Sequence, residues 1–205
     1  MDFGHGVTKL SVVIDGDTMK QLTIPVGGQD VDTDLEERLR LTYPGLQLTN
    51  HVRLIKERHC YASLEPRKQL EASSKSLNSS YELPDGTQVV VNQERALCLE
   101  KIFKFQYCRG SLAGLIKELI AMFPDNSSEL SQNIVIVGGT TQCTNFNYRL
   151  LSELYKNKAA SVVRIFCPPE RSYTCWVGAS IIYCDDDYDD KGMSFNEYNS
   201  PAAEV

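Results

Sequence analysis

The sequence predicts an α/β fold, because segments typical of strands and of helices alternate along the chain. In residues 133–151 (NIVIVGGTTQCTNFNYRLL), four branched apolar residues run into Gly138-Gly139, and apolar residues then recur every four positions. This order is typical of a strand, a turn and a helix. Residues 112–123 form the clearest amphipathic helical pattern of the chain. With 205 residues, 42% of them hydrophobic, the chain is long enough for one large domain or two small ones.

The first elements are predicted to be a hairpin and a helix. Residues 8–14 (TKLSVVI) are rich in strand formers, a turn follows at Asp15-Gly16-Asp17, and a second alternating segment ends at a glycine-rich loop, residues 25–28. Residues 33–36 (TDLE) match a capping box, in which the Thr hydroxyl and the Glu carboxylate satisfy free N–H groups. A helix is therefore expected to begin at Thr33 and to stop at Pro44-Gly45.

The later elements follow from the same signals. They are a helix at 52–61, a polar loop at 65–80, a hairpin at 81–91 around Pro84-Asp85-Gly86, a helix at 93–103, a strand at 161–166 and an apolar run at 176–183. Gly178 and Ala179 inside that last run would allow another part of the backbone to approach it closely.

Composition narrows the class of protein. A net charge of −6 argues against nucleic acid as a partner. Seven cysteines without a CxxC pair indicate a reduced, intracellular protein, and His59-Cys60 has no second pair that would complete a zinc site. No apolar stretch approaches 18 residues and the N-terminus does not resemble a signal peptide, so neither a membrane span nor secretion is expected.

Three short motifs have both a functional and an ordinary interpretation. Asp2-Phe3-Gly4-His5-Gly6 places two glycines before a strand, where backbone N–H groups can converge on a phosphate and an Asp can orient a metal-bound water. A GxG motif or a Gly138-Gly139 pair on its own is more typical of a plain turn. Lys56-Glu57 on a helix is, on its own, a surface pair.

Taken together and in order, these pieces closely resemble the actin family. The resemblance runs from Asp2 to at least Ile182, and it rests on five stretches: DFGHGVT at 2–8, KERHCYASL at 56–64, YELPDGTQVVV at 81–91, NIVIVGGTT at 133–141 and PPERSYTCWVGASI at 168–181. It implies an α/β, ribonuclease-H-like lobe of the actin/Hsp70-type ATPase fold with a smaller inserted subdomain. The first lobe of that fold is expected to be largely absent.

The resemblance also implies a division of the chain. Residues 1–26 and 106–173 would form the core of the second lobe, like subdomain 3 of actin. Residues 27–105 would form the inserted smaller subdomain, like subdomain 4. Residues 174–205 would be a tail that packs on the first lobe. An unrecorded upstream part and a short paralogue both remain open as explanations of this length.

A nucleotide site is implied by matching positions. Asp2, Gly4 and Gly6 match the second phosphate loop of the family, and Gly28 matches a glycine that lines the cleft. Lys56 and Glu57 match the pair beside the base and ribose. Gly138, Gly139 and Thr140 match the loop under the nucleotide. The expected cofactor is ATP or ADP with Mg²⁺; no residue is assigned as catalytic or as a direct metal ligand.

Three of the nucleotide contacts that the resemblance implies are altered in this sequence. His5 stands where the family has an Asp that helps to hold the metal-bound water. Cys143 stands where actin has a Tyr against the nucleotide, and the Pro-Gly that follows in actin is Thr144-Asn145 here. Ser172 stands where actin has a Lys beside the base. These changes predict that nucleotide binding is weakened or lost.

Three functions are consistent with the sequence. The first is a divergent actin or actin-related protein, nucleotide-binding by descent, that assembles with other actin-like subunits or actin-binding proteins in the cytoplasm and cytoskeleton, or in the nucleus. The second is a non-enzymatic scaffold subunit of a cytoskeletal or chromatin complex. The third is a fragment of an active ATPase. The chain as written is not expected to be an efficient ATPase, because phosphoryl transfer needs groups on both sides of the phosphate.

Overall fold

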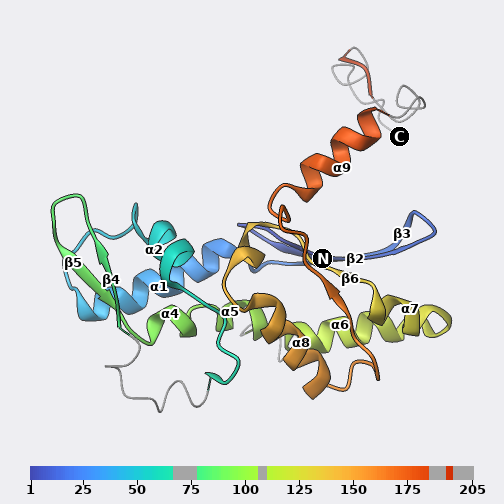
Figure 1. Ribbon diagram of the computed structural model, residues 1–205, viewed down its shortest axis with the longest axis horizontal. Coiled ribbons are helices and arrows are strands. Elements are labelled where there is room, and N and C mark those ends of the chain that lie inside the picture. Colours follow the sequence, from blue (N-terminus) through green and yellow to red (C-terminus); the bar gives the residue numbers. More distant parts are fainter. Residues whose placement is uncertain (67–77, 106–109, 185–192, 196–205) are drawn as a thin grey trace, which may run out of the picture.

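Strands and helices alternate in the computed structural model of the chain (Figure 1), which agrees with the predicted α/β class. The structure describes residues 1–66, 78–105, 110–184 and 193–195. Most of the polar loop expected at 65–80 and the acidic run at 185–190 therefore lie outside the described residues. The C-terminal tail is described only as far as Cys184 and at 193–195.

The predicted N-terminal hairpin is confirmed. Strand β2 (Thr8–Ile14) pairs antiparallel with β3 (Asp17–Ile24), and the short strand β1 (Asp2–Phe3) pairs antiparallel with the other edge of β2. Asp15 and Gly16 both have positive φ, 53° and 90°, as a two-residue hairpin turn requires. Side chains of β2 alternate between buried and exposed, so one face of the hairpin packs on the core.

Strand β1 joins this hairpin to a second, parallel pair. Strands β6 (Ile134–Val135) and β7 (Ile165–Phe166) run parallel, and Asp2 forms a parallel bridge with Val137 just after β6. The order across the molecule is therefore β3, β2, β1, β6 and β7. Both predicted strands of the second pair exist, but each is two residues long.

Helices cover one face of these strands (Figure 1). They are α6 (Leu112–Ala121), α7 (Ser127–Gln132), which follows a 3₁₀ turn at Pro124–Asn126, and α8 (Phe146–Lys156). Phe3 lies at the centre, with its ring 5.0 Å from that of Phe146 in an edge-to-face contact. The shared core extends through Leu10, Ile116 and Leu150.

The remaining elements form the other side of the molecule, at the left of Figure 1. They are α1 (Gly28–Thr42), α2 (Val52–His59), the hairpin β4 (Ser79–Glu82) with β5 (Gln88–Val91), α4 (Glu94–Leu97) and α5 (Glu100–Phe103). The predicted hairpin around Pro84-Asp85-Gly86 is confirmed, with β4 and β5 antiparallel and Gly86 at φ 84°.

The expected start of the first helix is wrong. Helix α1 begins at Gly28, five residues before Thr33, and the Thr33 hydroxyl donates to the Gln29 carbonyl within the helix. The N-terminal cap is instead built around Gly27, whose N–H donates to the Asp30 carboxylate at 2.8 Å. The predicted end is confirmed, because α1 stops at Thr42, just before Pro44-Gly45.

The single helix expected at 93–103 is divided. Between α4 and α5, Cys98 and Leu99 keep helical backbone angles, but the amides of Lys101 and Ile102 bond three residues back. The segment is therefore helical, with a tighter 3₁₀ step in its middle.

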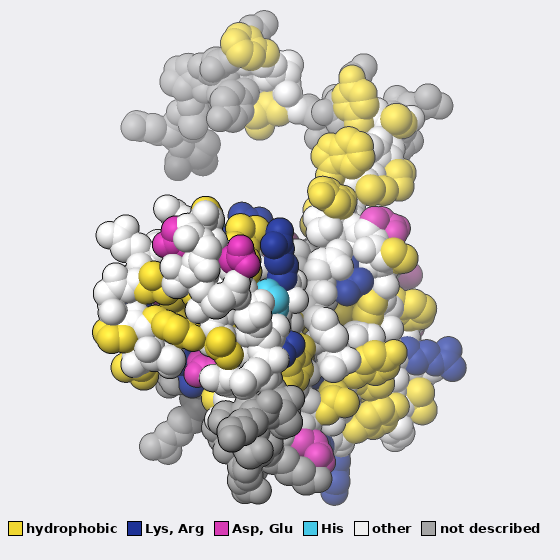
Figure 2. All heavy atoms as spheres, turned by 60° about the vertical axis from the view of Figure 1, so that its left-hand side comes forward, with side chains coloured by type: hydrophobic (Ala, Val, Ile, Leu, Met, Phe, Trp, Pro, Cys, Tyr) yellow, Lys and Arg dark blue, Asp and Glu magenta, His cyan; other side chains and the backbone are white. Residues whose placement is uncertain are grey.

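Helix α9 (Thr174–Tyr183) projects from the body of the molecule (Figure 1) and has no buried residue. Figure 2 shows hydrophobic side chains over this projection, and those of Trp176 and Ile181 are 71% and 68% exposed. A Cβ added at Gly178 would meet nothing within 4 Å, so the close approach expected there is not made by any part of the chain that the structure describes. Among the described helices, none is long and apolar enough to cross a lipid bilayer.

Candidate functional site

Residues from three separate segments converge on Gly28, at the N-terminus of α1. A Cβ built at Gly28 would lie 2.9 Å from Thr140 Oγ1, 3.3 Å from Lys56 Nζ and 3.5 Å from His5 Nδ1. The first loop, residues 4–7, follows β1; the second, residues 138–142, follows β6; and Lys56 comes from α2. The structure thus brings together most of the residues that the sequence predicts to be at the nucleotide site.

The two glycine loops are joined directly. The Thr140 hydroxyl donates to the carbonyl oxygen of Gly4 at 2.9 Å, across 136 residues of chain. Gly138 makes this approach possible, because a Cβ there would lie 2.4 Å from the Phe3 carbonyl oxygen and 2.7 Å from Asp2 Oδ1. Its φ of 96° also falls in the region that favours glycine. The glycine pair after the strand is therefore required for the contact between the loops.

Four backbone amides of these loops are available to a ligand. Within the described part of the chain, the N–H groups of His5, Gly6, Gly139 and Thr140 have no hydrogen-bond acceptor. Successive free amides in tight turns create a local positive field that suits anions. Gly6 and Gly139 also leave open space where a side chain would stand, since an added Cβ meets nothing within 4 Å at either position.

The N-terminus of α1 is capped by the first loop. The amides of Gly28 and Gln29 donate to the carbonyl oxygens of Gly4 and His5, at 3.0 and 2.7 Å. These bonds use the helix amides that an anion would otherwise take, and they fix the first loop against α1. Any phosphate would therefore be held by the loop amides.

Lys56 is positioned by groups of α1. Its ammonium donates to the Gly28 carbonyl at 3.0 Å and to Asp32 Oδ2 at 2.9 Å. The ion pair with Asp32 is largely shielded from solvent, with side-chain exposures of 13% and 17%. Lys56 therefore lies at the site with part of its charge already compensated.

Two predicted site residues differ in their surroundings. Asp2 lies beside Gly138, with its carboxylate against the turn that joins β6 to the second loop. Glu57 is exposed and pairs with Arg53 one turn earlier in α2, at 2.9 Å. The described structure does not bring Glu57 into the cluster around Gly28.

The structure shows where Cys143 and Ser172, two of the residues that depart from the family pattern, lie. Cys143 ends the second loop, and its thiol donates to the Cys60 carbonyl at 3.3 Å. Burial raises the pKa of the Cys143 thiol to about 12, so it is protonated at neutral pH. Ser172 is exposed near the loop, and its hydroxyl lies 3.4 Å from the Gln142 amide nitrogen. Neither residue offers the aromatic face or the charge of its family counterpart.

Arg171 was not singled out from the sequence, yet it supports the second loop. Its guanidinium donates to the Thr141 hydroxyl and carbonyl at 3.0 and 3.1 Å, and its carbonyl accepts the Gly138 amide at 2.8 Å. The only signal was its place in the stretch PPERSY, next to Ser172. Arg171 therefore acts on the site by holding the loop.

The donors present suit nucleotide phosphates better than a metal held by protein side chains alone. Among the described residues, no group of three or more His, Cys, Asp and Glu side chains is placed to hold a metal ion. Mg²⁺ usually keeps several waters and binds through few carboxylates together with substrate phosphates. Asp2 supplies a carboxylate beside the second loop, while His5 presents an imidazole where the resemblance implies a second carboxylate.

One comparison with known protein families identifies the chain. The model of the actin family, described as "Actin", matches residues 1–205, which is the whole sequence. The match includes both glycine loops and the elements that bring them together. This chain therefore belongs to the actin family.

Proposed function

We propose that this actin-like or actin-related protein binds the phosphates of an adenine nucleotide between its two glycine loops and acts through assembly with other proteins. The observation that carries the proposal is the hydrogen bond from Thr140 to the Gly4 carbonyl. It holds two loops together whose free amides lie next to Gly28 and Lys56.

The proposal rests on charge as well as on shape. Backbone amides fixed in a loop bind an anion without the cost of ordering flexible side chains. Lys56 adds a positive charge beside the loops, although its ion pair with Asp32 compensates part of that charge. Recognition of the adenosine part is proposed from the family resemblance of Lys56 and Glu57, and in the described structure Glu57 would have to leave Arg53 to take part.

The proposal concerns binding and not hydrolysis. Phosphoryl transfer depends on groups that position the attacking water and stabilise charge around the whole phosphate. The described loops approach a phosphate with backbone amides, and the position of one family carboxylate is taken by His5. Any ATP turnover by this chain is therefore expected to be slow.

Binding is tested by calorimetric titration of ATP and ADP, with and without Mg²⁺, on three glycine variants. Gly6→Ala and Gly139→Ala add a methyl group where the protein leaves open space, so the melting temperature should stay unchanged. If phosphates occupy that space, the affinity should fall by about tenfold, the loss of roughly one good contact. Gly178→Ala is the matched control, because its added methyl group also meets nothing.

Two outcomes would overturn the proposal. One is a wild-type chain that binds neither nucleotide at millimolar concentration. The other is wild-type affinity in Gly6→Ala and Gly139→Ala, which would move the binding site away from the loops.

A scaffold that has lost the nucleotide is the second candidate function. It is favoured by the ion pair between Lys56 and Asp32, which compensates the site cation internally, and by His5 in the first loop. In that case the loops only stabilise the fold. Gly139→Ala should then bind its partners as the wild type does, and added nucleotide should not change that binding. The same titration, combined with a pull-down of cytoskeletal and chromatin proteins, separates the two functions.

The proposed partners are other actin-like subunits or actin-binding proteins, and the proposed location is the cytoplasm and cytoskeleton, with the nucleus as a second site. The exposed apolar side chains of α9 support assembly, because isolated apolar surface of this kind usually marks a contact site. Co-sedimentation with actin filaments, and imaging of the tagged chain in cells, would test both points.

A further inference from the structure

Asp32 is a charged residue of α1 that lies beside the cluster at Gly28 and that no sequence motif marks. Both of its carboxylate oxygens lie 2.9 Å from Lys56 Nζ. Within the part of the chain that the structure describes, no other group donates a hydrogen bond to this carboxylate. Its side chain is only 17% exposed, so water compensates little of its charge. Asp32 therefore depends on Lys56 for a partner.

Lys56 is occupied in turn. An ammonium group has three N–H donors and no acceptor. Lys56 directs one donor towards Asp32 at 2.9 Å and one towards the Gly28 carbonyl at 3.0 Å, and its side chain is 13% exposed. One N–H therefore remains for a ligand, and the positive charge is already in contact with a negative one.

The ion pair borders the two glycine loops. A Cβ built at Gly28 would lie 3.3 Å from Lys56 Nζ and 2.9 Å from Thr140 Oγ1, so the ammonium and the second loop flank the same small space. The free amides of Gly139 and Thr140 belong to that loop. A phosphate held by these amides would come close to the Lys56 ammonium and to the carboxylate that already binds it. Like charges that are shielded from solvent and this close repel each other strongly.

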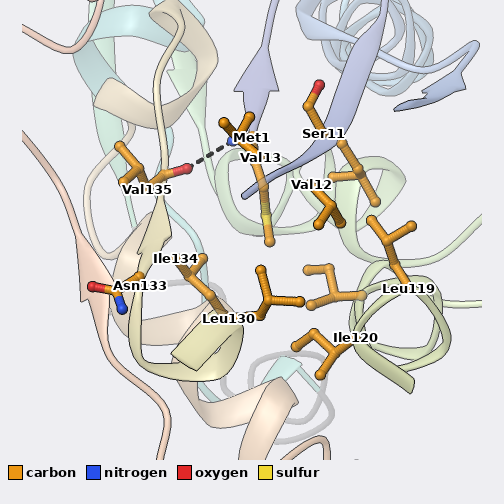
Figure 3. Close-up of a pocket in the computed structure, with 12 residues that line it drawn as sticks. Met1, Ser11, Val12, Val13, Leu119, Ile120, Leu130, Asn133, Ile134 and Val135 are labelled. Carbon is orange, nitrogen blue, oxygen red and sulfur yellow. Dashed lines mark hydrogen bonds between the residues drawn. The ribbon is translucent and has the colours of Figure 1, made fainter. Parts of the chain in front are cut away.

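The cavity at the other end of β1 does not offer phosphates a second place. Figure 3 shows this cavity, which measures about 240 Å³. The side chains that line it are uncharged, and most are apolar, such as those of Val12, Leu119 and Ile134. A phosphate placed there would have no cationic side chain as a partner, and burial of an unpaired anion is unfavourable. Competition for phosphates is therefore expected at the glycine loops.

We propose that Asp32 is an internal competitor of the nucleotide phosphates, which binds Lys56 until a more highly charged anion displaces it. The inference rests on the proposed function. Displacement would leave the Asp32 carboxylate without its one described donor in a place that is 17% exposed, and this cost lowers the affinity for the ligand. Asp32 is thus a positioning residue that acts through Lys56.

This role predicts a direction opposite to that of a merely structural one. If Asp32 only oriented Lys56 towards the ligand, its removal would misplace the ammonium and weaken binding. If Asp32 competes with the ligand, its removal frees the ammonium and strengthens binding. The effect should also depend on charge, because only an anionic ligand exchanges with a carboxylate. A chain of phosphates should gain affinity, and an uncharged nucleoside should not.

The test is calorimetric titration of inorganic tripolyphosphate, ATP and adenosine into the wild type and Asp32→Asn. The Asn side chain keeps the shape of Asp without its charge, and Lys56 keeps the Gly28 carbonyl as an acceptor, so the variant should fold. Its affinity for tripolyphosphate and for ATP should rise by about tenfold, and its affinity for adenosine should not rise. Melting temperatures of both proteins show whether the fold is intact.

Three further variants make the test specific. Glu37→Gln is the matched control, because it changes the net charge equally on an exposed position of the same helix, where salt screens the charge. Its affinities should stay near those of the wild type. Asp32→Glu keeps the charge and should bind as weakly as the wild type does. In a Lys56→Gln background, Asp32→Asn should give no gain, because the competition acts through the ammonium.

The possible outcomes separate this inference from the proposed function. Equal or weaker binding of tripolyphosphate and ATP by Asp32→Asn overturns the competitor alone, provided that the wild type binds and Gly139→Ala binds less. A gain of the same size in Glu37→Gln, or one that persists without Lys56, also overturns it. Binding by Asp32→Asn but not by the wild type would support the competitor while contradicting nucleotide binding by the unmodified chain. Absence of binding by both proteins at millimolar concentration overturns both proposals.

Discussion

The Thr140 hydroxyl lies 2.9 Å from the carbonyl oxygen of Gly4 and joins two loops that are 136 residues apart. Both loops follow strands of the same layer, so this bond fixes their separation. We expect Thr140→Val, which keeps the shape of the side chain, to lower stability by about 1 kcal/mol and to weaken nucleotide binding by about tenfold. Urea unfolding and calorimetry provide the two measurements.

The matched control for this prediction is Thr23→Val. Thr23 is exposed on β3, and none of its side-chain atoms makes a hydrogen bond in the described structure. If Thr140→Val and Thr23→Val bind ATP equally well, the contact between the loops has no part in holding the phosphates.

If the site binds Mg²⁺ with a nucleotide, as proposed, His5 is expected to set its metal dependence. It is exposed in the first loop, close to Gly28, where the family carries an Asp. A carboxylate at this position would accept hydrogen bonds from water bound to Mg²⁺, which a neutral or cationic ring does less well. Mg²⁺ strengthens ATP binding by some factor in the wild type, and we expect this factor to be about tenfold larger in His5→Asp. His5→Asn, which lacks the charge, should leave this factor near the wild-type value in the same titrations.

His59 makes stability depend on pH. Burial lowers the pKa of the His59 imidazole, and the nearby charges of Arg95 and Arg58 lower it further. The folded state therefore takes up the proton less readily than the unfolded state, whose histidine pKa is about 6.5. The contribution of neutral His59 to the free energy of unfolding is complete above a pH of about 6.5. It is lost as the pH falls from there towards the lower pKa of His59 in the folded state.

His59→Gln should remove this part of the pH dependence. The amide can still bond to the Ser79 hydroxyl, which lies 2.7 Å from His59 Nδ1. The experiment compares urea midpoints of the two proteins at several pH values between 7.5 and 5. An equally steep loss of stability in both proteins would place the responsible group elsewhere.

Local turn chemistry explains what the sequence predicted well. Asp15-Gly16 and Pro84-Asp85-Gly86 each contain residues suited to positive φ or to a fixed turn, so both hairpins were predicted with the correct turns. The order strand, glycine pair, helix at 134–156 was also correct, because it depends only on adjacent residues.

Contacts between distant segments explain what was missed. The start of α1 at Gly28 depends on the Gly4 and His5 carbonyls, more than 20 residues earlier, and the TDLE pattern at 33–36 gave no sign of them. For the same reason, spacing along the sequence could not group Gly4, Gly28 and Thr140, and only the family resemblance did so. The resemblance also grouped Glu57 with them, whereas the structure pairs Glu57 with Arg53.

Arg149 shows the same limit in the core. Its side chain is fully buried, and it donates to both carboxylate oxygens of Glu100 and to the carbonyl of Ser63. Its guanidinium also lies over the Phe103 ring, 4.8 Å from the centroid. A helix pattern alone assigns such an Arg to the solvent face, and only the fold supplies these partners.

Removal of this buried cation should be costly. We expect Arg149→Met to destabilise the protein by about 3–5 kcal/mol, because it leaves Glu100 without its main partner. Arg53→Met, which breaks an exposed ion pair with Glu57, should cost no more than about 1 kcal/mol. Urea unfolding of both variants gives the comparison, and similar losses in the two would contradict a structural role for the buried pair. The double variant Arg149→Met with Glu100→Gln should recover part of the loss.

Trp176 offers a test of assembly that is separate from folding. Its side chain is 71% exposed on α9, and no described residue of this helix is buried. Trp176→Ser should therefore change the free energy of unfolding by no more than about 0.5 kcal/mol. If α9 is a contact surface, the same variant should reduce self-association or partner binding, because large aromatic side chains dominate such contacts.

Analytical ultracentrifugation of the wild type and Trp176→Ser measures self-association. Met19→Ser on exposed β3 is the control for loss of an apolar side chain elsewhere. Equal sedimentation of all three proteins, together with unchanged capture of actin-like partners, would rule out α9 as the assembly surface.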